Sequence, residues 1–373
     1  MRTMRFESDV YDLAVGKHLR GGVEYVIPRE LIGYYACAAD GYLSLESYEI
    51  GKPFDPNRDW NDKSILVHRS GSAGDLLFIT PLLRELKKRW PRCQITMHCE
   101  ARYHWVFKNN PHVDVCVGPP LLREAVDAFD AQIDLESASE FHPQAKTRIL
   151  TEVYASVAGI DLSEGETLYI PPPDLVERMN KRFPKMATKR IGISLFSDGV
   201  LRNYPYQKNI EVIGALLKAG LQVVLFGKSA TGIKRTPLFI DLPGEQPTLS
   251  WEESTAFMKT CDLVLGPDSS AIHFAGAMGV PSLGLYGPFL AKLRIPSQPA
   301  TQAIQATGPC APCFHHGRAN IVFPSNGPCN QSKECDVLAS IPPWQVIEKI
   351  FDMLGLTAEG RAPVPMGRMM SSQ

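Results

Sequence analysis

The sequence predicts an α/β protein made of two successive domains, each built on a parallel β-sheet. From about residue 64 onward, short apolar runs alternate with amphipathic helical stretches, and the same alternation starts again near residue 189. This strand–helix rhythm is typical of parallel sheets that helices cover on both faces. The length of 373 residues also exceeds that of one ordinary domain.

The composition is that of a globular protein, with 44% apolar residues, 21% charged residues and a formal net charge of −1. These values exclude a disordered chain, a collagen, a coiled coil and a disulfide-dense miniature protein. They give no global attraction to nucleic acid or to an anionic membrane, although a locally basic groove for nucleic acid stays open. No apolar run is long enough for a membrane span, and the charged amino-terminal segment is unlike a secretory signal. We therefore expect a cytoplasmic protein.

Residues 1–60 differ from the rest of the chain. Short β-like runs at Val23–Ile27 and Tyr42–Leu45 lie among turn residues, and a polar stretch follows them. We predict that residues 1–60 form an N-terminal extension with some β structure.

The first domain is predicted over residues 61–185. It opens with a buried strand at Ile65–His68 and a loop of small residues that ends at Asp75, where a helix begins. Pro81 lies inside the apolar pattern of this helix and predicts a kink. Three more strands are predicted at Ile95–His98, Val113–Val117 and Gln132–Leu135.

The second domain is predicted over residues 186–356, and the tail at 357–373 is expected to be disordered. Its strands are predicted at Lys189–Leu195, Leu221–Phe226, Asp262–Leu265 and Ser282–Tyr286, and its helices at Ile210–Ala219, Ser254–Thr260, Ala271–Met278 and Pro343–Leu354. Both domains then read as Rossmann-like. Because ligands bind beyond the carboxyl ends of parallel strands, we expect the site in a cleft that the two domains share.

Two familiar nucleotide motifs are absent. The stretch that ends Gly227-Lys228-Ser229 has Gln222 where a P-loop requires its first glycine. The loop before Asp75 lacks the dinucleotide fingerprint and carries a carboxylate where a pyrophosphate would lie. A nicotinamide enzyme is therefore not expected.

Asp75 has two interpretations on its position alone. A carboxylate at a helix start commonly accepts hydrogen bonds from backbone N–H groups that have no partner within the helix. It could equally project from a strand-to-helix turn as a general base.

Two long segments resemble one known family. ILVHRSGSAGDLLFITPLLRELKKRWPRCQI is similar to the opening of the heptosyltransferase-like glycosyltransferases (family 9, GT-B fold), and GPDSSAIHFAGAMGVPSLGLYGP is similar to their D-[ST]-G-x-x-H-x-A-x-A-x-G-x-P block. A weaker match is Arg202–Pro205, where the family has lysine, any residue or arginine, tryptophan and proline. The resemblance covers roughly residues 63–352 and implies a GT-B fold, with two Rossmann-like domains that face each other across a cleft.

The resemblance also implies roles for single residues. Asp75 would be the catalytic base that deprotonates an acceptor hydroxyl. Ser197 and Arg202 would hold the phosphates of the donor, and Asp268 would bind the donor near its sugar. His273, at the family's histidine position, would be a further donor-binding residue. The diphosphate would meet the start of a helix, at the backbone N–H groups of Ser269, Ser270 and Ala271.

Simpler interpretations of these residues stay open, since Asp268 could cap a helix, His273 could be a half-buried imidazole and Arg202 a solvated charge. The sequence also departs from the family pattern. Ser270 replaces a glycine, and no glutamate follows Gly227 at the position that often contacts the donor ribose. The extension at residues 1–60 is not part of the ordinary pattern, which leaves the acceptor most open.

The expected reaction is an inverting, metal-independent sugar transfer with no catalytic cofactor. The chain contains no D-x-D triplet for a catalytic metal, and no glutamate occurs between Glu253 and Glu334, where retaining enzymes commonly carry a pair. The expected partners are an ADP-heptose-like nucleotide sugar and a glycan acceptor such as lipopolysaccharide core. A modified nucleic-acid base, a protein acceptor, or a noncatalytic binding module with the same fold are the alternatives.

Four cysteines near the C-terminus form a separate group. Cys310, Cys313, Cys329 and Cys335 fall within 26 residues, and thiolates at such spacing can hold structural zinc. Reduced loop thiols, or disulfides outside the cytoplasm, are the alternatives. His315 and His316 are spare ligands.

Overall fold

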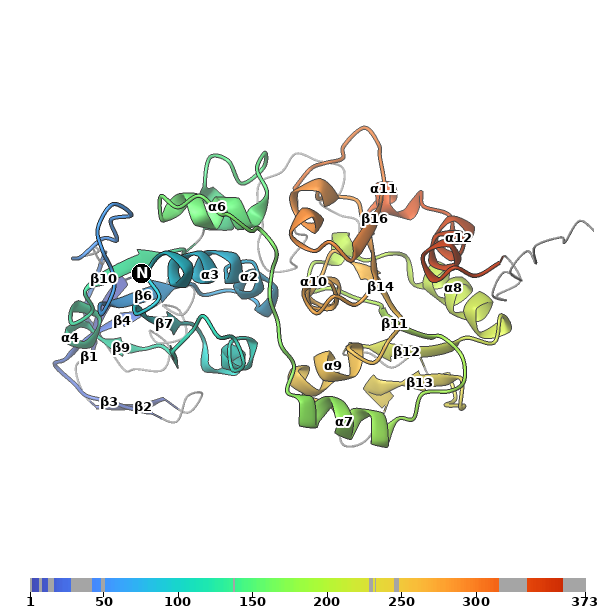
Figure 1. Ribbon diagram of the computed structural model, residues 1–373, viewed down its shortest axis with the longest axis horizontal. Helices are drawn as coiled ribbons and strands as arrows, with labels where there is room; N and C mark the ends of the chain where they lie inside the picture. The colour runs from blue at the N-terminus through green and yellow to red at the C-terminus, as the bar shows by residue number, and fades with distance from the viewer. Residues whose placement is uncertain are drawn as a thin grey trace, which may run out of the picture. The chain divides into compact units, whose positions relative to one another are not determined.

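The computed structural model describes residues 2–6, 9–12, 17–27, 42–47, 51–136, 138–227, 231, 233–244, 248–314 and 334–357. The chain divides into two compact units, Met1–Ile170 and Pro171–Gln373 (Figure 1). Each unit contains a parallel sheet with helices against it, so the predicted α/β class is confirmed.

The first unit is built on a four-stranded parallel sheet of order β10-β6-β7-β8. The loops after β6 and β10 leave neighbouring strands at the carboxyl edge of the sheet, where the strand order reverses. In open α/β sheets this reversal is where ligands bind. The strands are β6 (Ser64–His68), β7 (Gln94–His98), β8 (Val115–Val117) and β10 (Ala131–Asp134).

The single kinked helix predicted after Asp75 is two helices. α2 spans Ala73–Leu77, α3 spans Thr80–Arg89, and the chain breaks between them at Phe78 and Ile79. Pro81 is the second residue of α3, where a missing N–H costs no helical hydrogen bond. The other helices of this unit are η2 (Ala101–Val106), α4 (Arg123–Asp127), α5 (Ala138–Phe141) and α6 (Leu150–Val157).

The described part of residues 1–60 is mostly β structure. An antiparallel sheet of order β5-β1-β4-β9 has a small core of its own, formed by Met4, Phe6, Leu19, Tyr25 and Ile27. Because β4 pairs with β9, which lies between β8 and α4 in the sequence, this sheet is attached to the first unit. The strands are β1 (Arg2–Phe6), β4 (Glu24–Ile27), β5 (Tyr42–Ser47) and β9 (Leu121–Leu122), and a separate hairpin joins β2 (Val10–Asp12) to β3 (Lys17–Leu19).

The second unit has a six-stranded, wholly parallel sheet of order β13-β12-β11-β14-β15-β16. Numbered from β11, this is the 3-2-1-4-5-6 order of a doubly wound nucleotide-binding sheet, and its switch point lies between β11 and β14. The strands are β11 (Arg190–Ser194), β12 (Gln222–Phe226), β13 (Phe239–Asp241), β14 (Leu263–Pro267), β15 (Ser282–Tyr286) and β16 (Thr301–Gln305).

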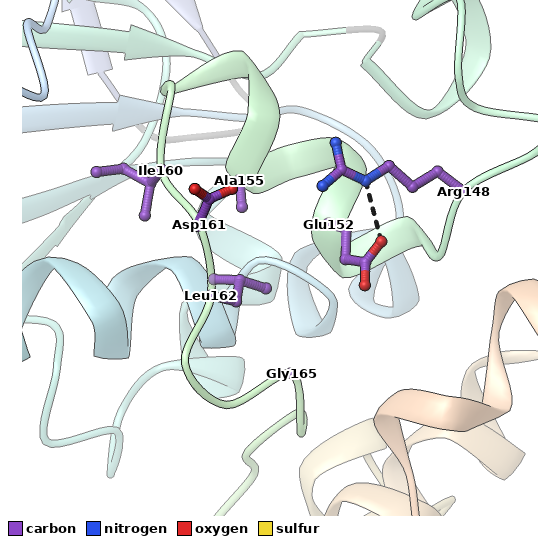
Figure 2. Close-up of a pocket in the computed structure, with 7 residues that line it drawn as sticks. All are labelled: Arg148, Glu152, Ala155, Ile160, Asp161, Leu162 and Gly165. Atoms are coloured by element: carbon purple, nitrogen blue, oxygen red, sulfur yellow. Dashed lines mark hydrogen bonds and ion pairs between the residues drawn. The ribbon is translucent and has the colours of Figure 1, made fainter.

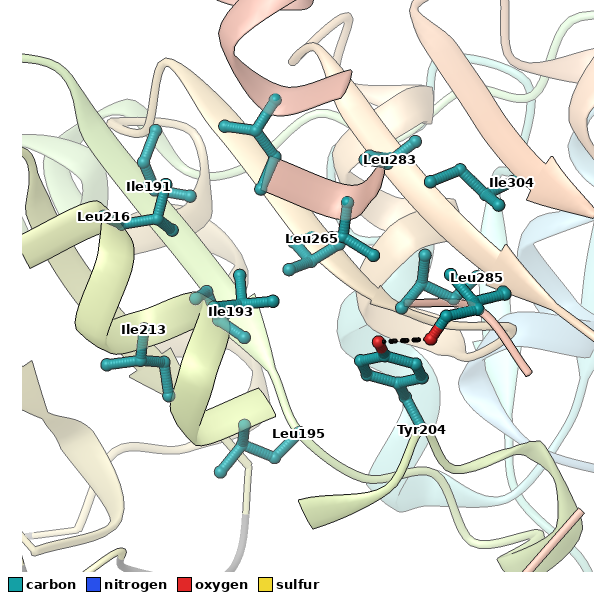
Figure 3. Close-up of a cluster of buried hydrophobic side chains, with 14 of the residues drawn as sticks. Ile191, Ile193, Leu195, Tyr204, Ile213, Leu216, Leu265, Leu283, Leu285 and Ile304 are labelled. Atoms are coloured by element: carbon teal, nitrogen blue, oxygen red, sulfur yellow. Dashed lines mark hydrogen bonds between the residues drawn. The ribbon is translucent and has the colours of Figure 1, made fainter. Parts of the chain in front are cut away.

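Helices cover both faces of this sheet, with α8 and α12 on one side and α9 and α10 on the other (Figure 1). The core under α8 packs Ile213 and Leu216 against strand residues such as Ile193, and the Tyr204 hydroxyl donates to the carbonyl of Ile341 at 2.8 Å (Figure 3). The helices are α7 (Pro173–Arg182), η3 (Val200–Arg202), α8 (Tyr206–Lys218), η4 (Leu242–Gly244), α9 (Trp251–Met258), α10 (Ser270–Ala277), η5 (Ala291–Leu293), η6 (Ile295–Ser297), α11 (Asp336–Ala339) and α12 (Pro343–Leu354).

Within the described parts of the chain, no helix combines the length and the apolar character that a bilayer crossing requires. The predicted tail from residue 358 onward lies outside the described residues.

Candidate active site

Asp75 lies at the switch point of the first sheet, in the first turn of α2. Its Oδ2 accepts hydrogen bonds from the backbone N–H and the hydroxyl of Ser72, at 3.0 and 2.9 Å. Ser72 is the N-cap residue and Asp75 is the third residue of the helix, so the carboxylate does stabilise the helix start. The residue is partly exposed, so this capping contact does not bury it fully.

Gly71 allows the Asp75 carboxylate and the Arg69 guanidinium to approach the same small space. Its φ of +120° favours glycine, and a Cβ placed there would lie 3.1 Å from Asp75 Oδ2 and 3.4 Å from Arg69 Nη2. Arg69 is buried, and it donates to the carbonyl of Leu135 and to the Ser139 hydroxyl. The carboxylate therefore lies beside a fixed positive charge.

In the second unit, the loops after β11 and β14 border the switch point and carry the residues predicted to bind the donor. Ser197 holds its own loop together. Its backbone N–H donates to Asn203 Oδ1 at 2.6 Å, and its hydroxyl lies 2.9 Å from the carbonyl of Gly199 and 3.0 Å from Asn203 Oδ1. The described contacts of Ser197 thus order the segment that carries Arg202.

Asp268 brings the other predicted residues together. Its Oδ1 lies 3.0 Å from Nε2 of His273, and its Oδ2 lies 3.8 Å from Nη1 of Arg202. Burial alone would raise the pKa of Asp268, but the hydrogen bond from His273 and the charges of Arg202 and Arg294 outweigh it and lower the pKa below its ordinary value. Arg202 is thus not a solvated loop charge, since only 18% of its side chain is exposed.

The sequence analysis missed three residues of this group. The first is Arg294, which lies close enough to Asp268 to lower the pKa of that carboxyl. The guanidinium groups of Arg202 and Arg294 lie 5.9 and 5.7 Å from the centre of the Phe289 ring.

The other two residues are Gln298 and Tyr286. Gln298 Oε1 lies 3.1 Å from Nδ1 of His273. Tyr286, at the carboxyl end of β15, lies close enough for burial and the charge of Asp268 to raise its pKa well above the ordinary value.

Several buried polar atoms around Asp268 have no hydrogen-bond partner in the part of the chain that the structure describes. They are Arg202 Nε, Ser269 Oγ, Tyr286 Oη and Gln298 Nε2. Buried polar atoms are normally paired, so such a group indicates a place where a polar ligand binds. The N-terminus of α10 adds the backbone N–H groups of Ser270 and Ala271 from its first turn, which favour an anion.

Of the four cysteines predicted to bind zinc, three are described. Cys310 and Cys313 are exposed, whereas Cys335 is buried as the N-cap residue of α11. Burial raises the pKa of the Cys335 thiol, and charge on Cys313 or Cys310 would raise it further, so the three thiols lie within electrostatic reach of one another. Cys329, His315 and His316 lie outside the described residues.

Another group that could hold a metal lies in the first unit. The ligand atoms of His68, Asp134 and Glu136 all lie within 4.8 Å of one another. The sequence analysis did not single out these residues, although each lies at or just after the end of a strand.

A cavity of about 150 Å³ in the first unit contains none of the predicted site residues. It lies between α6 and the segment that follows this helix, and the Arg148–Glu152 ion pair borders it (Figure 2). Among the described residues, its lining lacks the cluster of buried unpaired polar atoms that surrounds Asp268. We therefore take the surroundings of Asp268 as the candidate donor site of the second unit, and the loop of Asp75 as a separate candidate in the first unit.

Comparison with protein-family models places the chain in a family. The model of glycosyltransferase family 9 (heptosyltransferase) matches residues 86–321. The chain belongs to this family. It is therefore a glycosyltransferase, as the two sequence motifs indicated. No curated protein matches the chain.

Solved structures share the fold at low sequence identity. A family 9 glycosyltransferase from Veillonella parvula DSM 2008 is 17% identical, with a TM-score of 0.61, over 80% of this chain and 98% of its own. The E. coli ADP-heptose lps heptosyltransferase II is 16% identical, with a TM-score of 0.58, over 78% of this chain and 98% of its own. The iron-containing dodecameric glycosyltransferase TibC from enterotoxigenic E. coli H10407 is 13% identical, with a TM-score of 0.58, over 95% of this chain and 93% of its own.

Proposed function

We propose that the protein is an inverting, metal-independent glycosyltransferase that moves a heptose or a similar sugar from a nucleoside diphosphate to an acceptor hydroxyl. Membership of family 9 supports sugar transfer. Two structural neighbours, TibC and the E. coli heptosyltransferase WaaC, were solved with ADP-D-β-D-heptose and with ADP-2-deoxy-2-fluoro heptose respectively. An ADP-heptose-like donor is therefore our first candidate.

The observation that carries the proposal is the charge balance around Asp268. Two guanidinium groups, those of Arg202 and Arg294, act on one buried carboxylate, so the group retains surplus positive charge. The four buried polar atoms without partners in the described structure lie in the same group. A diphosphate would offer both the negative charge and the acceptor oxygens that these atoms require.

The chemistry follows from these groups. In the proposed reaction, Asp75 accepts the proton of the acceptor hydroxyl while that oxygen attacks the anomeric carbon. The bond from this carbon to the diphosphate oxygen breaks, and the diphosphate leaves with the electron pair. Arg202, Arg294 and the amides at the start of α10 would stabilise the charge that develops on the leaving group. One displacement inverts the anomeric configuration.

Donor binding and stereochemistry test the proposal separately. A thermal-shift screen should show that ADP-heptose and ADP raise the melting temperature, because a ligand that binds the folded state stabilises it by mass action. NMR of the product should show inversion at the anomeric carbon. If no nucleoside diphosphate or its sugar stabilises the protein, the proposed donor class fails. A retained configuration would exclude single displacement.

The acceptor is a glycan such as lipopolysaccharide core in our first proposal, and a protein or a modified nucleic-acid base in the second. The coverage of the structural matches bears on the N-terminal extension and not on the identity of the acceptor. The match to TibC covers 95% of this chain, whereas the match to the lps heptosyltransferase II covers 78%. The difference in coverage indicates that the part of the fold shared with TibC includes the N-terminal extension. Transfer assays with purified lipopolysaccharide core, protein and nucleic-acid acceptors would decide between the two proposals.

The cytoplasmic location inferred from the sequence remains a prediction.

We also propose that Cys310, Cys313, Cys329 and Cys335 hold a structural metal. The proposal is supported by the spacing of the four cysteines in the sequence and by the electrostatic effect of Cys310 and Cys313 on the Cys335 thiol, although the three described thiols do not all lie within ligand distance of one another. Zinc is the prediction from the sequence, and iron is the alternative because TibC is an iron-containing protein. Elemental analysis should find one metal per chain, lost in Cys313→Ser and kept in Cys261→Ser, since Cys261 is buried in the sheet region of the second unit. Metal-free wild-type protein would leave reduced thiols as the explanation.

A further inference from the structure

A chain of buried polar side chains lies behind the loop that carries Asp75. His68 and His98 end neighbouring strands β6 and β7, and their Nδ1 atoms lie 2.9 Å apart. His68 Nε2 lies 2.9 Å from Glu136 Oε2, and the two side chains are 1% and 7% exposed. Glu136 follows β10, on the other side of β6. The three side chains therefore cross the carboxyl edge of the sheet at its switch point.

Glu136 clamps one residue of the Asp75 loop. Its Oε1 accepts the hydroxyl of Ser70 at 2.7 Å, and its Oε2 accepts the backbone N–H of Ser70 at 3.1 Å. The backbone N–H of Glu136 donates to Asp134 Oδ1 at 3.0 Å, which anchors the glutamate itself. Hydrogen bonds to a buried carboxylate are stronger than neutral ones, so this clamp fixes both the backbone and the side chain of Ser70.

Ser70 is one residue before Gly71 and two before Ser72, which holds the Asp75 carboxylate through its N–H and hydroxyl. Gly71 adopts a φ of +120°, and a glycine leaves a loop free to take many conformations. A fixed residue on the near side of this glycine limits that freedom. In catalysis, a misplacement of about 1 Å can cost about 10²-fold in rate.

We propose that Glu136 is a positioning residue for the transfer reaction: through Ser70 it holds the loop that places Asp75 against the acceptor hydroxyl. The proposal rests on the proposed function, in which Asp75 is the base. It also gives Glu136 of the His68, Asp134 and Glu136 group a role through its hydrogen bonds to Ser70.

The chain contains a matched control for this clamp. Glu85 on α3 is 6% exposed, and its Oε2 accepts both the backbone N–H and the hydroxyl of Ser163, at 3.1 and 2.6 Å. Glu85 and Glu136 thus share residue type, unit and a double contact with one serine, and their side chains are 8% and 7% exposed. Glu85 receives both serine bonds on one oxygen, and its Oε1 accepts a hydrogen bond from Arg89 Nε at 3.0 Å. The two glutamates also differ in what they hold, since Ser163 belongs to the segment after α6 and Ser70 to the Asp75 loop.

Glu136→Gln and Glu85→Gln should be compared in full-length protein with ADP-heptose as donor. The amide nitrogen cannot accept a hydrogen bond, so Glu136→Gln loses one of its two acceptor contacts with Ser70, and Glu85→Gln loses the charged contact between Oε1 and Arg89. Both variants should melt at a lowered temperature. We expect kcat to fall about tenfold or more only in Glu136→Gln. The KM for the donor should not change in either variant. Equal kcat values in the two variants would overturn the proposal and leave Glu136 a structural residue.

A double-mutant cycle shows whether Glu136 acts through Asp75. If it does, adding Glu136→Gln to Asp75→Asn should lower the residual turnover little further, because the base that Glu136 positions is already lost. Independent, multiplicative losses would overturn the positioning role. If Asp75→Asn alone leaves turnover unchanged, the base assignment in the proposed function fails instead, so the two failures are distinguishable.

Discussion

The two aspartates with predicted roles, Asp75 in the first unit and Asp268 in the second, differ in burial and in the groups around them. Each lies just beyond a strand that borders the switch point of its own parallel sheet. Asp75 is partly exposed, and Ser72 donates two hydrogen bonds to one of its oxygens. Asp268 is 4% exposed and faces His273, Arg202 and Arg294.

This difference suggests separate chemical roles for the two carboxylates. A carboxylate whose pKa is lowered by two arginines and a histidine holds protons poorly, so Asp268 suits a fixed negative charge that orders those cations. A partly exposed carboxylate such as that of Asp75, which accepts hydrogen bonds from Ser72 and lies near Arg69, can meet a substrate and take its proton. The comparison therefore predicts that Asp75 affects turnover, whereas Asp268 affects stability and donor binding.

The largest effect is expected at Asp75. Asp75→Asn keeps the shape of the side chain but removes its basicity, so turnover should fall by about 10²-fold or more while donor affinity stays nearly unchanged. Single-turnover kinetics and donor titration by calorimetry would measure the two quantities. Unchanged turnover would remove Asp75 from the mechanism and with it the proposed division of roles.

Asp268→Asn should lower stability. It leaves two arginines facing a neutral amide, and loss of hydrogen bonds to a buried charge costs about 2 kcal/mol. Since the folded state lowers the pKa of Asp268, its contribution is complete at pH 7 and is lost as pH falls below about 4, the ordinary pKa of aspartate. Urea midpoints of wild type and variant should thus converge toward low pH. The exposed Asp174, tested as Asp174→Asn, should show no such difference at pH 7.

Arg294→Ala should weaken donor binding about tenfold, which corresponds to about 1.4 kcal/mol for a lost charge-assisted contact to phosphate. Arg202→Ala should weaken it similarly, because the two guanidinium groups act on the same carboxylate. Titration with ADP measures the effect, and Arg178→Ala on the exposed side of α7 is the control. Equal ADP affinity in Arg294→Ala and Arg178→Ala would separate Arg294 from the donor site.

The smallest effect is expected for a methyl group at Gly71. Gly71→Ala forces a side chain into a φ of +120° and places it 3.1 Å from the Asp75 carboxylate, so stability should fall by about 1 kcal/mol and turnover several-fold. Gly214→Ala has nothing within 4 Å in helix α8 and should stabilise by about 0.5–1 kcal/mol. Chemical denaturation and kcat would be compared; a harmless Gly71→Ala would show that the loop does not require glycine there.

Local patterns in the sequence were sufficient for the two motifs and for most strands of the two parallel sheets, but they missed strands β13 and β16 and helices α6 and α7. The helix predicted at Pro343–Leu354 has those bounds, because its amphipathic period, its initial proline and its terminal glycine are all local signals. The predicted helix after Asp75 was wrong in one respect, since Pro81 begins a second helix and does not kink the first. The sequence pattern allows either one kinked helix or two separate helices, and tertiary packing determines which of them forms.

The partners of the key carboxylates lie far away along the chain. Glu136 is 66 residues from Ser70, and Gln298 is 25 residues from His273. Arg294 and Gln298 lie at the irregular turns between β15 and β16, where no periodic pattern marks a residue as buried or functional.

By itself, the sequence indicated the α/β class and the family motifs. It also pointed to Asp75, Arg202, Asp268 and His273 as candidate site residues. These depend on hydrophobic periodicity and on short spacings that the covalent chain preserves. Only the tertiary structure decided which charges surround each aspartate, and that Glu136 and Arg294 belong to these groups. The physical reason is that a parallel sheet places the carboxyl ends of neighbouring strands side by side whatever their distance along the chain.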